Sequence, residues 1–493
     1  MNVWLVNVND QNFFRLMPGA SDPANRPASR VRIMGFPPLG IQTLAAVLSE
    51  RGHEIRMFDT CHPEMTADHI VAASAAGPPD VLAISFLSAT TYPEVKTLAG
   101  RFKDSAPGTP IIVGGPFASI NAVRIVRDCP EIDGVGVGEG EELLPDYLNN
   151  LSDPAAVSGL VWRYGDEVIQ NPARPLIDDL DRYPCPDRQS LPIDFIESLP
   201  LDVPAVLSLD KFCTMQTSRG CPFSCIYCDI PTLSQRKWRA RSPEHVLEEM
   251  QRLHDQGYRS IYLTDDHFLL HSERVQKICE GIIRRKLAFH WGGEGRVDSA
   301  AVSQLKLLQQ AGCKKLAFGI EAGMQKVLDR LGKRQTLEQV ERAVGEAKKQ
   351  GIERLHGFFV IGSPGETEAD IMASFRFAAR LPLDTFSFNR LSVYRGTPLW
   401  NEYVDGGIID DDRDWYKWFK CSDLDPTALP GKVVNRARMK GYSLLFAHRL
   451  VFRPMRTFRL LRSFARHMSL ADILRLLLSP FRRREMTRKP DLL

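Results

Sequence analysis

Three cysteines lie close together near the middle of the chain, at Cys221, Cys225 and Cys228. Their C-x3-C-x2-C spacing directly follows a predicted strand over residues 214–217, so the three thiolates can converge on one inorganic centre. Cysteine thiolates hold iron–sulfur clusters, and a [4Fe–4S] cube held by three of them keeps one iron open for another ligand. A zinc site completed by a fourth ligand, such as Cys213, is the alternative that the spacing leaves open.

The same segment resembles the signature of the radical S-adenosylmethionine (SAM) enzymes, which have an aromatic residue before the last cysteine, here Tyr227. The resemblance implies that the three cysteines bind a [4Fe–4S] cluster and that SAM chelates its open iron. One electron would then cleave SAM to methionine and a 5′-deoxyadenosyl radical, which abstracts a substrate hydrogen. Tyr227 would lie beside the adenine.

Other motifs of this family follow in its usual order. Arg296 lies in a Gly-Arg-Val-Asp segment, and Glu321 lies in Gly-Ile-Glu-Ala-Gly, where this subfamily often has Gly-Ile-Glu-Ser-Gly. Gly362 and Pro364 lie in a run similar to the family's adenine-side strand. The resemblance implies that these four residues contact SAM.

Several polar residues near predicted strand ends have more than one interpretation. Asp265 and Asp266 either bind SAM or substrate, or cap the turn that follows them. His267, His290 and His356 could handle protons, but a lone histidine is more often structural, so we assign none of them a catalytic role.

The first part of the chain resembles the cobalamin-binding module that precedes this barrel in one large subclass. The residues that match are Pro38, Leu39, Gly40, Ser85, Gly114, Gly115, Glu139 and Gly140. Glycines at strand ends let a large macrocycle approach the backbone. The Asp-x-His-x-x-Gly motif that supplies an imidazole to cobalt is absent, since Asp59-x-x-His62 has the wrong spacing. The alternative is a vestigial scaffold that binds nothing.

Short apolar runs alternate with amphipathic helical patterns in this part of the chain. The predicted strands are residues 3–8, 54–58, 80–86, 110–114 and 133–137, and a helix is predicted over 39–50. Strands separated by helices of 10–15 residues favour a parallel sheet covered on both faces. The pattern therefore predicts a doubly wound, flavodoxin-like or Rossmann-like domain over residues 1–150, of the α/β class.

Residues 151–210 change in character. A predicted hairpin over 159–170 and a proline-rich stretch indicate a linker between domains. Six further strands are predicted at residues 214–217, 260–264, 289–292, 315–319, 356–361 and 386–393. The spacing predicts a (β/α)6 partial barrel over 211–400, with its site at the carboxyl ends of the strands. A helical, basic region over 401–493 completes the chain.

The charge is distributed unevenly. From Lys432 onward the sequence has 16 Lys or Arg and 3 acidic residues, which leaves 47 basic and 57 acidic residues elsewhere. Arginines from Arg449 to Arg466 recur at helical spacing beside apolar residues. Such a helix can lie on an anionic membrane, which suits a lipid-like substrate. We favour packing against the acidic body of the same chain, with peripheral membrane contact as the alternative.

Composition limits the remaining classes. The chain has 493 residues, 44% of them hydrophobic, with only ten cysteines, so it is typical of a globular protein and not of a disulfide scaffold. No run of 18 apolar residues and no signal peptide is visible, so a cytoplasmic protein is expected. No basic face interleaved with aromatic residues is recognisable, so nucleic acid is not expected as a partner.

The resemblance implies a cobalamin-dependent radical SAM methyltransferase that acts on an unactivated carbon of a small-molecule or lipid-like substrate. One SAM would methylate the cobalamin and a second would supply the radical. A reductant such as flavodoxin or ferredoxin would provide electrons. The alternatives are a non-methylating cyclase or ring-rearranging enzyme, and a non-catalytic corrinoid or cluster protein.

Overall fold

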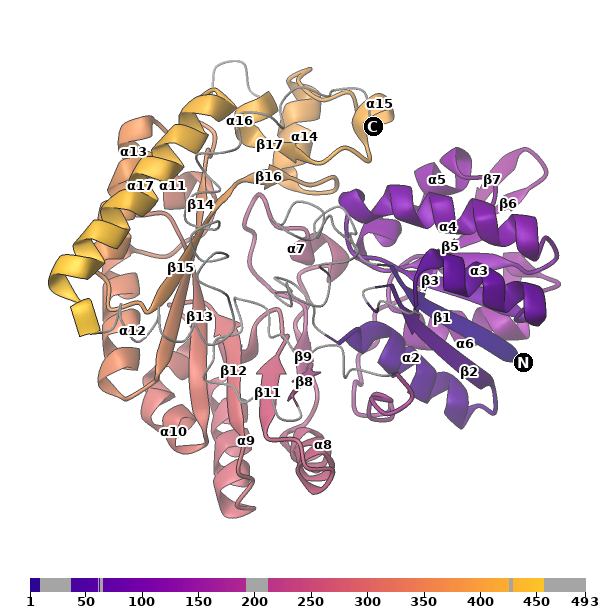
Figure 1. Ribbon diagram of the computed structural model, residues 1–493, viewed down its shortest axis with the longest axis horizontal. Coiled ribbons are helices and arrows are strands. Elements are labelled where there is room, and N and C mark those ends of the chain that lie inside the picture. Colours follow the sequence, from indigo (N-terminus) through magenta and orange to yellow (C-terminus); the bar gives the residue numbers. More distant parts are fainter. Residues whose placement is uncertain (9–36, 61, 63–64, 192–211, 425–428, 456–493) are drawn as a thin grey trace, which may run out of the picture.

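The computed structural model describes residues 1–8, 37–60, 62, 65–191, 212–424 and 429–455. Two α/β units lie side by side (Figure 1), the first drawn in indigo to purple and the second in pink to yellow. Each unit is built on its own sheet. The carboxyl ends of strands in both sheets therefore decide where ligands can bind.

The first unit is a seven-stranded sheet in the order β2-β1-β3-β4-β5-β6-β7. Its parallel strands are β1 Asn2–Asn7, β2 Glu54–Asp59, β3 Val81–Ser85, β4 Ile111–Gly114 and β5 Gly134–Gly136. One face packs against α2 Leu39–Glu50 and α6 Gly140–Asn149, and the other against α3 Ala67–Ala76, α4 Tyr92–Ser105 and α5 Pro116–Asp128. The predicted doubly wound α/β fold is confirmed.

The hairpin of β6 Leu160–Tyr164 and β7 Glu167–Gln170 extends this sheet with two antiparallel strands. The sequence predicts the hairpin but assigns it to a linker, and here the structure differs. Leu160 packs into the core on one face of the sheet and Val161 into the core on the other. The first sheet therefore continues beyond residue 150, because β5 would otherwise expose an unpaired edge.

The second unit is a six-stranded sheet in the order β15-β14-β13-β12-β11-β8, with all neighbours parallel. The strands are β8 Phe212–Met215, β11 Ser260–Leu263, β12 His290–Gly295, β13 Cys313–Glu321, β14 Arg354–Ile361 and β15 Thr385–Arg390. The helices that follow them are α8 Pro243–Asp255, α9 Ser272–Arg284, α10 Leu305–Gln310, α11 Gln325–Arg330, α12 Leu337–Lys349 and α13 Glu368–Arg380. The first and last strands do not pair, so the predicted (β/α)6 partial barrel is confirmed.

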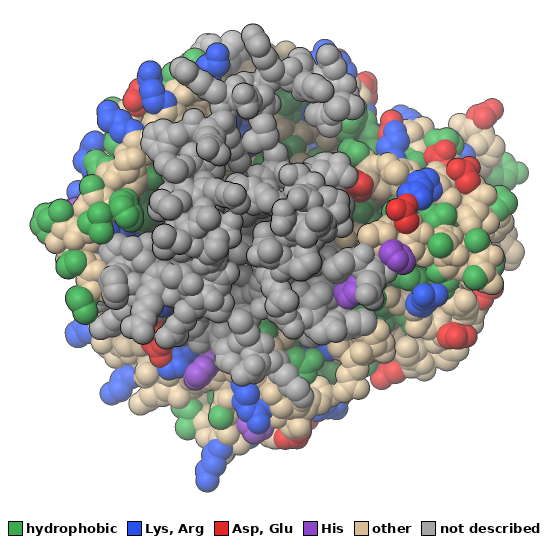
Figure 2. Space-filling view, in the orientation of Figure 1, with side chains coloured by type: hydrophobic (Ala, Val, Ile, Leu, Met, Phe, Trp, Pro, Cys, Tyr) green, Lys and Arg blue, Asp and Glu red, His purple; other side chains and the backbone are tan. Residues whose placement is uncertain are grey.

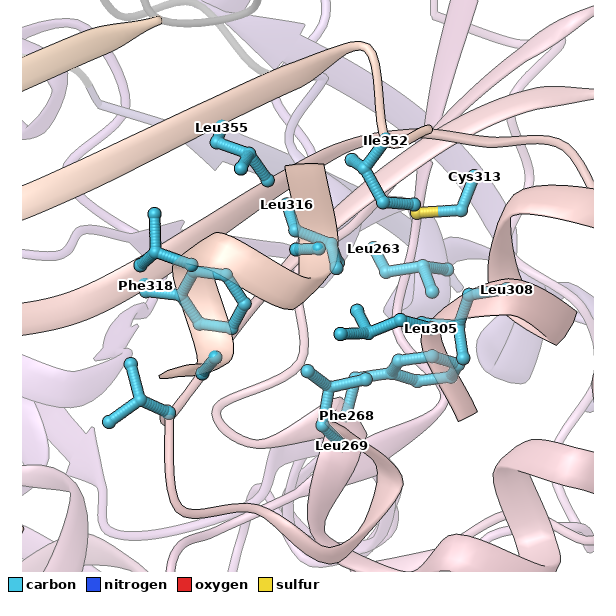
Figure 3. Close-up of a cluster of buried hydrophobic side chains, with 14 of the residues drawn as sticks. Leu263, Phe268, Leu269, Leu305, Leu308, Cys313, Leu316, Phe318, Ile352 and Leu355 are labelled. Atoms are coloured by element: carbon cyan, nitrogen blue, oxygen red, sulfur yellow. The ribbon is translucent and has the colours of Figure 1, made fainter. Parts of the chain in front are cut away.

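The outer face of this sheet carries the larger core. Figure 3 shows Leu263, Leu316 and Phe318 from the strands beside Leu305 and Leu308 of α10. Because side chains alternate along a strand, the neighbouring positions face the inside of the barrel. Polar residues occupy several of these inner positions, among them Tyr262, Lys315 and His356, all of them buried.

The C-terminal region covers the end of the barrel. It contains β16 Ser392–Val393, α14 Pro398–Asp405, α15 Asp411–Asp414, β17 Phe419–Lys420, α16 Cys421–Leu424 and α17 Gly431–Phe452. Helix α17 lies along α13 (Figure 1) and buries Val434 and Leu445. None of the helices in the described ranges is long and apolar enough to cross a bilayer.

Candidate cluster and cofactor site

The cysteine segment leaves β8 at the carboxyl edge of the barrel. Its first part forms β9 Ser218–Arg219, which pairs with β10 Arg239–Ala240 and precedes the short helix α7 Ile230–Leu233. Two aspartates fix this segment: Asp265 accepts hydrogen bonds from the amide and hydroxyl of Thr217 at 2.7 and 2.6 Å. Asp266 accepts one from the amide of Gly220 at 2.7 Å. These bonds reach a segment 46 to 48 residues earlier in the chain, which differs from the predicted cap of the turn that follows the two aspartates. Contact of Asp265 or Asp266 with SAM or substrate stays a prediction.

The three predicted cluster cysteines lie close enough for each thiol to interact electrostatically with another. The amide of Cys228 donates a hydrogen bond to the carbonyl of Cys225 at 3.3 Å, which turns the chain tightly between them. Burial raises the pKa of the Cys228 thiol to about 12 and also raises that of Cys221, where the charge of Cys225 adds to the effect. Bound metal must therefore displace protons from these sulfurs.

The donor set fits an iron–sulfur cluster, because three thiols are gathered in one loop. Among the described residues, no three His, Cys, Asp or Glu side chains are placed to hold a single metal ion. Cys213, the fourth zinc ligand considered above, is buried among the apolar residues of the outer barrel core. The burial of Cys213 in that core argues against it as a fourth ligand beside the three cysteines.

Arg296 lies beside this loop with its guanidinium fixed on every side. It donates two hydrogen bonds of 2.8 Å to Asp298 and one of 2.5 Å to the carbonyl of Lys333. Its central carbon lies 3.9 Å from the ring centre of Phe223, and Nη1 lies 3.8 Å from the sulfur of Cys225. Burial opposes the charge, but Asp298 and the two nearest cysteines raise the pKa of Arg296 above its ordinary value.

Glu321 ends β13 in a left-handed backbone conformation, with φ of 68°. Such a conformation is unusual for a residue with a side chain and is found more often at functional sites. Its carboxylate pairs with Nζ of Lys333 at 2.7 Å. A Cβ atom on Gly319 would lie 2.6 Å from that carboxylate, so the glycine makes room for the pair.

Tyr227 joins the same group. Burial raises its pKa well above the ordinary value, and the charge of Glu321, to which it is hydrogen-bonded, raises it further. The structure thus brings Tyr227, Glu321 and Arg296 together around the cysteine loop. Lys333 belongs to this group but was missed by the sequence analysis, since nothing in its neighbours along the chain indicates a buried partner.

Gly362 and Pro364 lie in the turn that follows β14. The amides of Gly362 and Ser363 donate hydrogen bonds of 2.7 and 3.0 Å to one oxygen of Glu366. Burial raises the pKa of Glu366 to about 7. This turn lies next to Ser422 and Val434 in the C-terminal region.

The residues that match a cobalamin module gather at the carboxyl edge of the first sheet. Pro38 precedes α2 with Leu39 and Gly40 in its first turn, Ser85 ends β3, Gly114 ends β4 with Gly115 next, and Gly140 begins α6. A Cβ atom on Gly40 or Gly138 would meet nothing within 4 Å. One on Gly114 would meet only the carbonyl of Gly136, at 3.9 Å. Open space at Gly40, Gly114 and Gly138 fits a flat macrocycle lying against the backbone at these positions.

Glu139 stands apart from the other residues predicted to contact cobalamin. It accepts hydrogen bonds from Nη1 of Arg219 at 2.9 Å, from Nη1 of Arg239 at 2.7 Å and from the amide of Ile177 at 2.8 Å. Burial opposes its ionisation, but Arg239 and Arg219 lower the pKa of Glu139 below its ordinary value. Glu141 accepts a further bond from Arg219. These acids join the edge of the first sheet to the cysteine loop.

Comparison with known proteins agrees with this arrangement. The Radical SAM superfamily matches residues 215–378, and the B12 binding domain matches residues 34–148. An uncharacterized methyltransferase of Pyrococcus horikoshii is 31% identical over 401 residues, covering 80% of this chain and 84% of that protein. The anaerobic magnesium-protoporphyrin IX monomethyl ester cyclase of Rubrivivax gelatinosus is 26% identical over 428 residues, covering 84% and 74%.

A solved structure shows the same fold. The cobalamin-dependent S-adenosylmethionine radical enzyme OxsB, with aqua-cobalamin and SAM bound, superimposes with a TM-score of 0.70 at 19% identity. The likeness covers 96% of this chain and 72% of OxsB.

A doubly wound domain joined to a cysteine-bearing partial barrel defines an enzyme of the radical SAM class with a corrinoid-type first domain. The chain belongs to the cobalamin-dependent radical SAM family. Its cofactors are accordingly a [4Fe–4S] cluster, SAM and cobalamin, and it draws on a small-molecule substrate and an external reductant.

Proposed function

We propose that this enzyme is a methyltransferase that acts on an unactivated carbon of a small-molecule or lipid-like substrate. The proposal rests on a contact between the two α/β units. Glu139, at the edge of the first sheet that is proposed to bind cobalamin, accepts a hydrogen bond from Arg219, which lies two residues before Cys221. Methyl transfer requires the methyl donor and the radical source to flank one substrate carbon. A direct link between the two cofactor-binding segments supports that requirement.

Each group of residues has a distinct task in this proposal. Cys221, Cys225 and Cys228 hold the cluster, while Tyr227 and Glu321 orient SAM. When bound beside one substrate carbon, the cofactors would supply the radical chemistry and the methyl group that this proposal requires. The open positions at Gly40 and Gly114 leave room for the corrin. Cys225 is buried, which limits the access of water to that side of the cluster site.

Methyl transfer and cyclase chemistry are distinguished by their products. The test is to purify the protein anaerobically from cells supplied with cobalamin, measure corrinoid per chain, and then assay SAM products with candidate substrates. A methyltransferase forms S-adenosylhomocysteine and 5′-deoxyadenosine in comparable amounts, whereas a cyclase forms only 5′-deoxyadenosine. The relative named as a methyltransferase is 31% identical to this chain and the cyclase 26%, which favours methyl transfer. Protein that contains iron and sulfide at cluster stoichiometry but no corrinoid would exclude methyl transfer.

The reductant is proposed to be a flavodoxin or a ferredoxin, since each delivers single electrons at low potential. The test compares SAM cleavage driven by reduced flavodoxin with cleavage driven by dithionite. Cleavage with dithionite alone would exclude flavodoxin as the donor.

A second proposal concerns peripheral membrane contact. The last turn of α17 exposes Leu450, Val451 and Phe452, and Met455 is exposed just beyond the helix, each by 47% or more of its surface. Hydrophobic side chains are visible at the corresponding left edge of Figure 2. A large exposed apolar patch beside a basic segment is typical of a surface that enters a lipid interface.

Two arginines of the predicted basic helix face contact the protein itself and are not part of the proposed membrane surface. Arg449 donates hydrogen bonds to the carbonyls of Asp384 and Leu383, and Arg453 donates to that of Leu381. For these two residues, packing on the same chain is observed. Arg456, Arg459, Arg462 and Arg466 lie outside the described residues.

The test for membrane contact is sedimentation of the full chain with vesicles of phosphatidylcholine and phosphatidylglycerol. Binding should require the anionic lipid, weaken with salt, and fall in the double variant Val451→Glu, Phe452→Glu. The matched control is Tyr164→Glu, because Tyr164 is an exposed aromatic residue at the end of β6, in the first unit. Equal sedimentation of the double variant and the parent would contradict the proposal.

A further inference from the structure

The guanidinium of Arg296 is held in one orientation by contacts from three directions. Its Nε and Nη2 each donate a hydrogen bond of 2.8 Å to the carboxylate of Asp298. Nη2 donates a second hydrogen bond, of 2.5 Å, to the carbonyl of Lys333. The ring of Phe223 packs against its face. Only 6% of the residue is exposed. A side chain fixed in this way has no freedom to turn toward solvent.

The remaining nitrogen, Nη1, points to Cys225, whose sulfur lies 3.8 Å away. Asp298 lies on the opposite side of the guanidinium, so the ion pair presents its positive end to the sulfur. Hydrogen bonds and positive charge near the sulfurs of an iron–sulfur cluster stabilise its reduced, more negative form. The effect is larger in a buried site because the surroundings screen charge weakly.

We propose that Arg296 is a positioning residue that raises the reduction potential of the cluster through Cys225, instead of contacting SAM as the family resemblance implies. The inference rests on the proposed cluster at the three cysteines, but not on methyl transfer. Reduction adds one electron to the cluster and takes it from the external reductant. Arg296 makes that electron easier to accept, because its charge favours the reduced state.

The test is a potentiometric titration of the reconstituted cluster followed by electron paramagnetic resonance, without SAM. Arg296→Gln should shift the equilibrium for one-electron reduction about tenfold toward the oxidised form, which lowers the midpoint by about 59 mV. Arg296→Lys should recover part of the shift, since it retains the charge without the planar fork. Arg330→Gln is the control, because Arg330 is partly exposed and pairs with Glu402 at 2.5 Å.

The affinity for SAM, measured by equilibrium dialysis, separates the two roles. Unchanged SAM affinity with a lowered potential supports the proposal, and an unchanged potential with weakened SAM binding overturns it. Should Arg296→Gln fail to take up iron, Arg296→Met, which also lacks the charge, decides instead: a midpoint potential equal to that of the parent would overturn the proposal. A parent protein without iron would refute the cluster assignment itself, whereas a lack of corrinoid would refute only methyl transfer.

Discussion

Glu139 of the first unit and Arg219 of the second are joined by a hydrogen bond of 2.9 Å, although 80 residues separate them in the sequence. Arg219 lies two residues before Cys221, so this bond links the edge of the first sheet that is proposed to bind cobalamin directly to the cysteine segment. Arg239, from the strand paired with this segment, binds the same carboxylate. The contact therefore fixes both strands of the small ribbon, β9 before the cysteines and β10 after them.

Replacing Glu139 by Gln should loosen this junction without removing cobalamin. The uncharged amide leaves Arg219 and Arg239 without a carboxylate partner at this position. Because the side chains of Glu139 and Arg219 are partly exposed, we expect a loss of about 2 kcal/mol in the free energy of unfolding. Hydrogen exchange should increase over residues 216–241. Glu402→Gln, at an exposed pair, is the control. Loss of corrinoid with unchanged exchange would show instead that Glu139 contacts the cofactor.

Single Ala variants of Cys221, Cys225 and Cys228 should each lose most of the bound iron and all reductive cleavage of SAM, because a cube with only two protein ligands is poorly held. Cys213→Ala should retain both, since Cys213 lies in the outer core. Iron, sulfide and 5′-deoxyadenosine are the quantities to measure. Equal loss of metal in all four variants would support the alternative of a zinc site with Cys213 as the fourth ligand.

Lys333→Met should destabilise the protein by about 3 kcal/mol, because it leaves the buried carboxylate of Glu321 without its partner. Urea unfolding measures the change. The double variant Lys333→Met, Glu321→Gln should recover part of the loss, since it removes the unpaired charge. Lys314→Met is the matched control, because Lys314 pairs with the more exposed Glu353. An equally small effect at both lysines would contradict a structural role for the buried pair.

Acid should weaken the fold through His356. Burial, and then the charge of Lys315, lower its pKa from 6.5 to about 3. A histidine with a lowered pKa in the folded state stabilises the fold above pH 6.5, and that stability is lost as the pH falls toward 3. We expect a loss of about 2 kcal/mol between pH 7 and pH 5.

His356→Gln should flatten this part of the pH profile of unfolding free energy, because glutamine does not titrate. His290→Gln, at an exposed position on β12, serves as the surface control. A variant profile as steep as that of the parent would show that other groups cause the acid sensitivity.

Local features could be predicted from the sequence because their causes are local. The pattern Thr336-x-x-Gln339 is typical of a capping box, and these two residues form one at the start of α12. Ser242 before a proline is typical of a helix start, and its side chain caps α8. Helix α2 spans the predicted residues 39–50. In each case the deciding contact lies within a few residues of the pattern that predicts it.

The site was only partly predictable, because its key pairs depend on distant contacts. The Glu321–Lys333 pair needs the register shift between Gly319 and Glu321, where β13 departs from regular pairing with β14. The role of Glu139 depends on how two separately folded sheets meet. A motif places such a residue near a site, but the choice between cofactor and neighbouring side chain is made only in the assembled fold.

The junction at Glu139 also bears on how such enzymes diversify or could be rebuilt. A first domain transplanted into a relative would bring Glu139 and Glu141 but leave Arg219 and Arg239 behind. A chimera should therefore exchange the segment with Glu139 and Glu141 together with the β9–β10 ribbon that carries Arg219 and Arg239. The transplanted first domain would then keep its contacts with the second unit.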